Sequence, residues 1–335
     1  MSNSRFCQLK QYGGPSKLHV TNIGKPSIVG DDEILIRIKA ASINSADWRI
    51  MRADPFLIRL MFGLRSPSKL PKGGIGADIA GVVEATSSNV KQFKAGDAVY
   101  GDLSSCGFGG FADYVVVSET AALANKPSSI SFEEAASLPM ASLTALEAIK
   151  DVAKVSDGDQ VVIHGAGGGV GSMAVQIAKA YGGHVTAVCN TKKVQKMKDI
   201  GADIVVDYTK EDFTKMDQKF DVIIDCGAYH SVWKMRKALK PTGHYVVIGG
   251  TFRNLLRSMF YSPFLSHKGG QTISVIENKP TRARLDAVRD LVESDKLKPV
   301  IDKKFSLDHV VDAMTFFEEG KPTGKVIVTM TKDDE

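Results

Sequence analysis

Cysteine is scarce in this chain of 335 residues, and its four cysteines lie far apart, at positions 7, 106, 189 and 226. No two of them form the C-x-x-C spacing that is typical of structural zinc sites. The wide spacing also argues against a disulfide framework. We therefore expect buried free thiols.

Long apolar runs are missing as well. No stretch reaches the ~18 unbroken apolar residues of a membrane span, and the first residues, MSNSRFCQLKQYGG, lack the apolar core of a secretory signal. We therefore expect a cytoplasmic protein without a transmembrane segment.

No basic run is interleaved with aromatic residues, which argues against a nucleic-acid partner. The net charge of +5 comes from 43 basic and 38 acidic residues spread along the chain, and it suits small anionic ligands equally well. Hydrophobic residues make up 43% and charged residues 24%, as in a soluble globular protein, and the length allows two domains.

Residues 160–190 predict a strand, a helix and a second strand. An apolar run at 161–163 is followed by five small residues at 165–169. A second apolar strand is expected at 185–189. Between them, apolar residues recur at helical spacing, at Val170, Met173, Ala174, Ile177, Ala178 and Tyr181.

The small residues between the first strand and the helix predict a dinucleotide-binding turn. Ala166, Gly168 and Gly171 take the three positions of G-x-G-x-x-G, with Ala in place of the first Gly. A Cβ at the second position would block the pyrophosphate, and one at the third would push the helix off the strand. Gly169 and Val170 open the helix, whose free N–H groups favour phosphate.

The remainder of the chain predicts an α/β protein with two domains. Residues 33–40 alternate between apolar and polar positions, and further short strands are indicated before residue 125. Strand and helix signals then alternate to residue 278, as in a doubly wound parallel sheet. A lone final strand at 325–330 must pair elsewhere. We therefore predict domains at 1–124 with 279–335, and at 125–278.

Two segments combine apolar and basic residues. Residues 51–72 are predicted as an amphipathic helix that covers its own domain, or alternatively as a mobile lid or a membrane-surface element. Residues 252–268 offer a second candidate for peripheral membrane contact.

Several motifs together resemble the medium-chain dehydrogenase/reductase superfamily, and within it the zinc-free quinone oxidoreductases of the zeta-crystallin type and their plant chloroplast-envelope relatives. This resemblance implies a GroES-like β-rich catalytic domain and a Rossmann domain. Besides the glycine turn and the final TGKVIV strand, the motifs are ASINSADW at 41–48, GADIAGVV at 76–83, GGFADYVVV at 109–117 and SLPMASLTALEAI at 137–149.

The departures from zinc alcohol dehydrogenases suggest the chemistry. Asn44 stands where those enzymes have their first zinc ligand, a Cys, and Ala77-Asp78 replaces their His-Glu pair. Without a metal, the resemblance implies hydride transfer to a quinone or an α,β-unsaturated carbonyl, whose negative charge is delocalised. Asn44 is the expected donor. Asp47 is the nearby carboxylate candidate, and a purely structural role for it is equally open.

Cofactor choice is predicted from the end of the second strand. Asn190 occupies the place where NAD enzymes typically carry Asp or Glu, and Thr191 and two lysines follow it. In the resembling quinone reductases, residues that match Lys193 and Tyr208 hold the 2′-phosphate, so NADPH is the expected cofactor. By the same resemblance, further cofactor contacts are expected at Thr144, Gly227, Gly249, Gly250 and Lys325.

The sequence therefore predicts an NADPH-dependent, zinc-independent reductase of quinones or enones. The alternative is an NADPH-binding sensor or structural protein with little turnover. We also expect a homodimer, because residues 271–276 would otherwise leave an apolar sheet edge bare.

Overall fold

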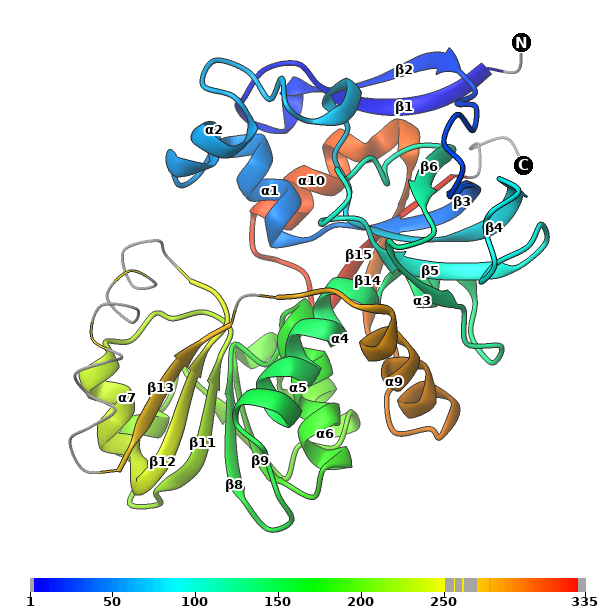
Figure 1. Cartoon of the computed structure of the whole chain (residues 1–335). Helices are drawn as coiled ribbons and strands as arrows, with labels where there is room; N and C mark the ends of the chain where they lie inside the picture. The colour runs from blue at the N-terminus through cyan, green and yellow to red at the C-terminus, as the bar shows by residue number, and fades with distance from the viewer. Residues whose placement is uncertain (1–2, 251–255, 257–260, 262–269, 277, 331–335) are drawn as a thin grey trace. The chain divides into compact units, whose positions relative to one another are not determined.

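The computed structural model describes residues 3–250, 256, 261, 270–276 and 278–330 (Figure 1). The chain forms two compact units. The first comprises residues 1–140, 280–293 and 301–335, and the second comprises residues 141–279 and 294–300.

The predicted domain boundary at residue 125 is therefore too early. Helix α3 (Phe132–Ala136) contacts strands of the first unit, and its Ala135 and Ala136 are fully buried. Helical spacing could not reveal which unit this helix would cover. The tail also returns briefly to the second unit, because the side chain of Gln176 accepts from Lys298 N at 2.8 Å and donates to Lys298 O at 3.0 Å.

The second unit is built on a parallel sheet in the order β10-β9-β8-β11-β12-β13. Counted from β8, this is the 3-2-1-4-5-6 order of the doubly wound Rossmann fold, which confirms the predicted fold class. Residues 161–163 of β8 are fully buried, as expected for a strand covered on both faces. The strands are β8 (Gln160–His164), β9 (His184–Cys189), β10 (Ile204–Asp207), β11 (Phe220–Asp225), β12 (Leu239–Val247) and β13 (Thr272–Val275).

Helices connect these parallel strands. Helix α5 contacts β8 and β9, α6 contacts β10, and α7 contacts β12. The connections have the length that a crossover between parallel strands requires. The helices of this unit are α5 (Gly169–Ala180), α6 (Val194–Asp199) and α7 (Val232–Ala238), and α4 (Pro139–Leu146) runs into the unit from the first one.

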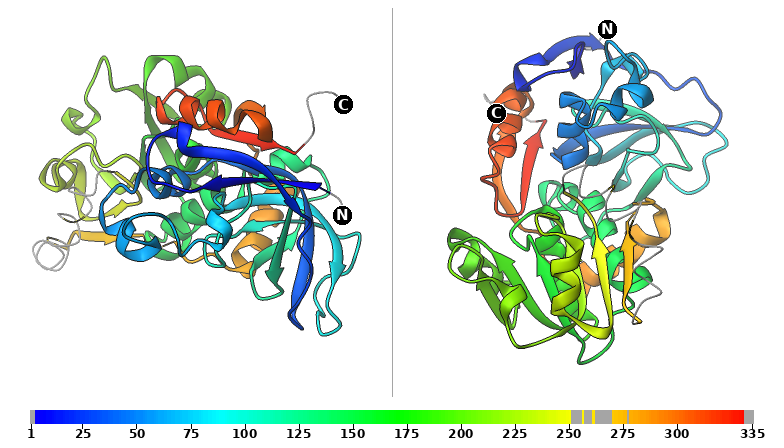
Figure 2. Two further views of the ribbon diagram at one scale, coloured as in Figure 1. Left: turned by 90° about the horizontal axis from the view of Figure 1, so that it is seen from above. Right: turned by 90° about the vertical axis from the view of Figure 1, so that its left-hand side faces the viewer.

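The first unit is β-rich. Its largest sheet has the order β14-β15-β3-β4-β5-β7, and β6 also pairs with β3. The strands β1 and β2 form a separate antiparallel pair, drawn in dark blue in Figure 2. The strands are β1 (Asn3–Leu9), β2 (Leu18–Gly24), β3 (Glu33–Ser42), β4 (Asp78–Thr86), β5 (Ala98–Asp102), β6 (Tyr114–Ser118), β7 (Ala122–Asn125), β14 (Ile301–Ser306) and β15 (Lys325–Thr329).

Two predictions about this sheet are confirmed. The alternating residues Ile34, Ile36, Ile38 and Ala40 of β3 are at most 1% exposed. The final strand β15 pairs antiparallel with β3, so the C-terminal tail returns to the N-terminal sheet. Two helices accompany the tail, α9 (Arg282–Glu293) and α10 (Val310–Glu318).

The prediction of one amphipathic helix over residues 51–72 is wrong. Helix α1 (Ser45–Arg52) ends at Ala53, whose φ of +52° is left-handed, and a short helix α2 (Leu57–Phe62) follows. Pro55 lacks the N–H that a continuous helix would need. Several large apolar side chains of this segment are exposed, so the segment does not simply cover its own domain.

The other membrane hypothesis concerned residues 252–268, and apart from 256 and 261 these lie outside the described residues. Within the described part of the chain, no helix has both the length and the apolar character needed to span a membrane.

Candidate functional site

The turn between β8 and α5 has the geometry of a phosphate-binding site. A Cβ on Gly171 would lie 2.3 Å from Gly165 O, so the close approach of helix and strand requires glycine there. A Cβ on Gly168, the N-cap of α5, would meet Gly165 O at a permissive 3.6 Å and no other atom within 4 Å. The protein's own packing does not require glycine at position 168. A ligand that closely approaches the backbone there would require it.

The neighbouring motif residues support this use of the turn. Ala166 is fully buried, and its N–H donates to Val188 O in β9 at 3.0 Å. Gly169 and Val170 begin α5, whose N-terminus has no side-chain cap. The first N–H groups of a helix of 12 residues are therefore available to an anion.

The end of β9 provides groups that suit a phosphorylated ribose. The Oδ1 atom of Asn190 is buried and has no hydrogen-bond partner in the described part of the protein, so it is an unused acceptor at the end of β9. Lys193 lies over the glycine turn, with its Nζ 3.3 Å from Gly167 O. Tyr208 follows β10, is 56% exposed, and donates its N–H to Cys189 O at 3.0 Å. These residues fit a nicotinamide dinucleotide.

Thr191 was also predicted to contact the cofactor, and that contact stays a prediction. Its hydroxyl donates to Asp207 Oδ2 at 2.6 Å, which ties the end of β9 to the end of β10. The hydrogen bond from Thr191, together with those from Thr209, holds the pKa of Asp207 below its usual range. Thr191 is thus a structural residue of the site.

A pocket of about 410 Å³ opens at the carboxyl ends of these strands, where ligands bind in sheets of this type. Its lining includes Gly165 of the turn and Tyr208. The other lining residues are His164, Glu211, Asp212, Phe213, Tyr229 and His230.

A group of three buried polar residues that the sequence did not indicate includes His164 of the pocket lining. Nδ1 of His164 is 2.8 Å from Asp225 Oδ1, and Tyr245 donates its hydroxyl to Asp225 Oδ2 at 2.8 Å. Burial by itself would raise the pKa of Asp225, but the hydrogen bond with His164 and further donors hold it below its usual value. The sequence offered one signal for this contact: His164 and Asp225 each end an apolar strand, and these two strands pair in the sheet.

Two of three further glycines predicted to contact the cofactor have sufficient structural reasons to be glycine. A Cβ on Gly227 would meet the Tyr229 ring at 2.7 Å, but this side chain is 78% exposed and can move. A Cβ on Gly249 would meet Cys226 O at 2.9 Å. Gly250 has a φ of +125°. Their contact with a cofactor therefore stays a prediction, as does that of Thr144, which lies on α4 and is 6% exposed.

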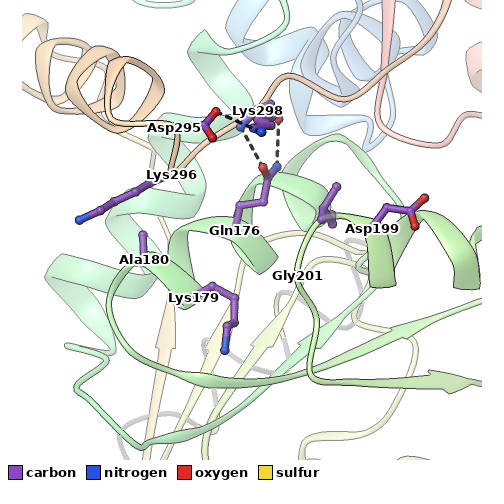
Figure 3. Close-up of a pocket in the computed structure, with 9 residues that line it drawn as sticks. Gln176, Lys179, Ala180, Asp199, Gly201, Asp295, Lys296 and Lys298 are labelled. Carbon is purple, nitrogen blue, oxygen red and sulfur yellow. Dashed lines mark hydrogen bonds and ion pairs between the residues drawn. The ribbon is translucent and has the colours of Figure 1, made fainter.

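A second pocket, of about 430 Å³, lies beside the C-terminal half of α5 (Figure 3). Its charges are largely used by the protein itself. Lys179 pairs with Asp203 at 2.8 Å, outside the lining, and Lys298 pairs with Asp295 at 3.1 Å. The contacts of Gln176 with the backbone of Lys298 cross this pocket and anchor the returning tail.

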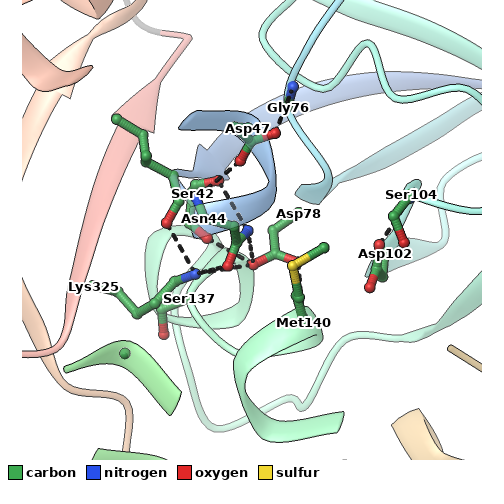
Figure 4. A network of polar contacts seen from close by, with 12 residues as sticks. Ser42, Asn44, Asp47, Gly76, Asp78, Asp102, Ser104, Ser137, Met140 and Lys325 are labelled. Carbon is green, nitrogen blue, oxygen red and sulfur yellow. Dashed lines mark hydrogen bonds and ion pairs between the residues drawn. The ribbon is translucent and has the colours of Figure 1, made fainter. Parts of the chain in front are cut away.

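The first unit contains a buried polar network around the end of β3 (Figure 4). Asp47, on α1, accepts from Asn44 N at 2.8 Å and from Gly76 N at 3.0 Å. Complete burial raises the pKa of Asp47 to about 7, against the lowering effect of these two N–H donors. Because both of its oxygens hold the backbone and it is 0% exposed, the structural alternative for Asp47 is favoured over a catalytic one.

Asp78, the first residue of β4, is at the centre of the network and is 0% exposed. Its Oδ2 accepts from Ser42 Oγ and Asn44 Nδ2, each at 2.8 Å, and from Lys325 Nζ at 3.2 Å. Its Oδ1 accepts from Met140 N at 2.9 Å. Four donors therefore surround one carboxylate.

Lys325 was predicted to contact the cofactor, which stays a prediction, and in the structure it belongs to this network. It is 3% exposed, and Nζ also donates to Asn44 Oδ1 at 2.5 Å and to Ile43 O at 3.2 Å. All three of its protons are thus used inside the first unit. Its position at the start of β15, next to β3, brings this ammonium to Asn44.

The network also fixes the orientation of the Asn44 amide. Lysine can only donate and carboxylate can only accept, so Oδ1 faces Lys325 and Nδ2 faces Asp78. The second N–H of Nδ2 has a weak contact, 3.5 Å from Ser42 O. That proton is the one that Asn44 could donate to a substrate oxygen.

These residues do not fit a catalytic zinc ion. Asn44 and Ala77 are poor or impossible ligands, and Asp78 faces the ammonium of Lys325. Across the described residues, no three His, Cys, Asp or Glu side chains gather where they could hold a metal.

Comparison with known proteins places this geometry in a family. Residues 30–128 match the alcohol dehydrogenase GroES-like domain, and residues 200–328 match the zinc-binding dehydrogenase family. The chain is 37% identical to 2-methylene-furan-3-one reductase of Solanum lycopersicum over 95% of its length and 76% of the relative. It is 34% identical to the chloroplastic NADPH-dependent alkenal/one oxidoreductase of Arabidopsis thaliana, over 95% of this chain and 77% of the relative.

A solved structure gives the same result. The quinone oxidoreductase from Coxiella burnetii superposes with a TM-score of 0.87 at 28% identity, over 98% of this chain and all of the other. The order of the strands, the glycine turn and these relatives agree, and the chain therefore belongs to the medium-chain dehydrogenase/reductase superfamily, in the group that contains quinone and enone oxidoreductases.

Proposed function

We propose that this protein is an NADPH-dependent, zinc-independent oxidoreductase that transfers hydride to a quinone or an α,β-unsaturated carbonyl. The observation that carries the proposal is the network around Asp78, in which the Asn44 amide stands where zinc alcohol dehydrogenases are expected to have their first ligand, and the Lys325 ammonium binds both Asn44 and Asp78. The names of the relatives, an enone reductase and quinone and alkenal/one oxidoreductases, support the same substrate class.

The residues of the second unit would hold the dinucleotide. The bare backbone at Gly168 and the N-terminus of α5 suit the pyrophosphate, while Asn190, Lys193 and Tyr208 suit the ribose and its 2′-phosphate. When bound, the nicotinamide supplies the hydride. Because a carboxylate is absent at position 190 and a cation lies over the turn, we propose a preference for NADPH over NADH.

The residues of the first unit would help to stabilise the developing charge. Reduction of a conjugated substrate places negative charge on its oxygen, where conjugation delocalises it, so a few fixed donors suffice. The weakly held N–H of Asn44 is such a donor, and Asp78 and Lys325 keep its amide in one orientation. Asp47 and Lys325 are buried and fully bonded, so we propose that water supplies the proton.

The test is a screen of NADPH oxidation with quinones, enones and saturated ketones as acceptors, run with and without a metal chelator. We expect turnover with conjugated acceptors only, and no effect of the chelator. Activity that chelation abolishes and zinc restores would contradict zinc independence. Absence of turnover with every acceptor, together with tight NADPH binding, would favour an NADPH-binding sensor or structural protein instead.

We further propose a homodimer that pairs through β13, which is the last strand of the parallel sheet as described. An unpaired edge strand favours association, and a two-fold axis would cover it. A monomeric mass by light scattering would contradict this. The expectation of a cytoplasmic protein stays a prediction that cell fractionation can test.

A further inference from the structure

Five large apolar side chains form one exposed patch on and around α2. Phe56, Leu57, Leu60, Met61 and Leu64 are 67%, 49%, 53%, 62% and 60% exposed. They are five of the ten exposed large hydrophobic residues in the described part of the protein, and they fall within nine positions. We call these five residues the apolar patch. Such clustering marks a binding surface rather than scattered surface residues.

The patch stands on an anchored helix. The opposite side of α2 packs on the core through Ile58 and Phe62, and the ring of Phe62 lies 6.1 Å from that of Phe108. The hydroxyl of Tyr12 donates to Gly63 O at 2.8 Å, just after the helix. These contacts hold α2 in one orientation, so the helix cannot simply rotate to bury the apolar patch.

Several cations lie near the patch along the chain. The two neighbouring segments, residues 1–30 and 55–77, contain no Asp or Glu, and the exposed Asp54 precedes the second of them. They are joined at Tyr12, whose ring lies 4.8 Å from the Arg59 guanidinium. Six cations of these segments lie nearest the patch in sequence or through these contacts. Among the described residues, none of the six has a carboxylate within ion-pair distance. They are Lys10, Lys17, Arg59, Arg65, Lys69 and Lys72.

We propose that the apolar patch inserts into the surface of an anionic lipid bilayer, with acidic headgroups held by the cations of the neighbouring segments. Apolar side chains beside lysines and arginines match the apolar and anionic layers that a membrane surface presents together. A second copy of this chain is a poorer partner, because a two-fold contact would place cations against cations. The attachment would be peripheral and would leave the fold unchanged.

Sedimentation of the full chain with lipid vesicles tests the proposal and needs no turnover. We expect binding to vesicles that contain phosphatidylglycerol, little binding to phosphatidylcholine alone, and release by salt. The double variant Leu60→Gln/Met61→Gln should lower the affinity roughly tenfold or more. Arg65→Glu should lower it several-fold for anionic vesicles only.

The matched control is Val29→Gln, because Val29 is 89% exposed but lies outside the patch, and it should bind as the unchanged protein does. Circular dichroism and NADPH titration should be alike for all these variants. Failure to bind anionic vesicles, or binding that the double variant leaves unchanged, would overturn the proposal. Two other results for the double variant would also overturn it. Unchanged vesicle binding with a raised KM for the acceptor would indicate a substrate lid. Loss of a dimeric mass would indicate an interface between two copies of this chain.

Discussion

Replacing Lys325 with Met should destabilise the first unit strongly. The substitution keeps a similar volume but removes the ammonium that faces Asp78, leaving a carboxylate that is 0% exposed without its cation. Breaking a buried pair from one side costs about 3–5 kcal/mol. Asp78 keeps the donors Ser42, Asn44 and Met140, which reduces the cost. Asn44 Oδ1 loses its donor, which adds about 1 kcal/mol or more. We expect a net loss of about 3–5 kcal/mol.

The assay is urea unfolding followed by tryptophan fluorescence. The chain has two tryptophans, and Trp48 lies in the first unit while Trp233 lies in the second. A Trp233→Phe background therefore reports on the first unit alone. The control is Lys304→Met, since Lys304 is 53% exposed and lies 3.7 Å from Glu133 in the same unit. An exposed pair of this kind contributes less than about 1 kcal/mol.

Equal losses of unfolding free energy for Lys325→Met and Lys304→Met would refute the reasoning. They would mean that removal of the Lys325 ammonium leaves no unpaired charge buried at Asp78. A second variant sharpens the test. Adding Asp78→Asn to Lys325→Met removes the unpaired charge and should recover part of the lost stability. A further loss of the same size would show that the pair does not act as a unit.

Three further predictions follow from the site. Gly171→Ala places a Cβ 2.3 Å from a backbone oxygen and should lower both the Tm of the second unit and NADPH affinity, whereas Gly168→Ala should lower NADPH affinity alone; equal Tm losses would contradict this. The pKa of Asp47 is raised from 3.8 to about 7, so the folded protein binds a proton at Asp47 more tightly than the unfolded chain does. This proton's contribution to stability is complete below about pH 4 and is lost as pH rises toward 7. The unchanged protein should therefore lose about 2–3 kcal/mol more than Asp47→Asn between about pH 5 and pH 8, and parallel unfolding curves would contradict the raised pKa. Lys193→Glu should weaken NADPH roughly ten- to a hundredfold and NADH far less, measured by fluorescence titration, and equal Kd values for both cofactors in the unchanged protein would refute the assignment.

The local features of this protein could be predicted from its sequence. The spacing of apolar residues in 160–190 predicted β8, α5 and β9, because helices and strands repeat with different periods. Gly171 could be recognised because a Cβ is excluded wherever a helix must approach a strand this closely. The alternation in β3 likewise predicted its buried face.

The polar centres depended on contacts between distant parts of the chain. Asp78 and Lys325 are 247 positions apart, and His164 and Asp225 are 61 positions apart. No local pattern links such residues, since they meet only through the pairing of β15 with β3 and of β3 with β4, and through that of β11 with β8. The bond from Thr191 to Asp207 could not be foreseen for the same reason, because Asp207 comes from the next strand.

Burial separated the correct from the incorrect predictions about helices. The larger apolar side chains are in α2, yet α3 covers the sheet of the first unit with its Ala135 and Ala136 while α2 leaves its apolar patch exposed. The sequence by itself determined the strands, the glycine turn and the residue types available for chemistry, because these follow from short-range sterics and periodicity. Tertiary structure alone decided which side chains are buried and which charges meet, because desolvation and pairing depend on the surface that distant segments cover.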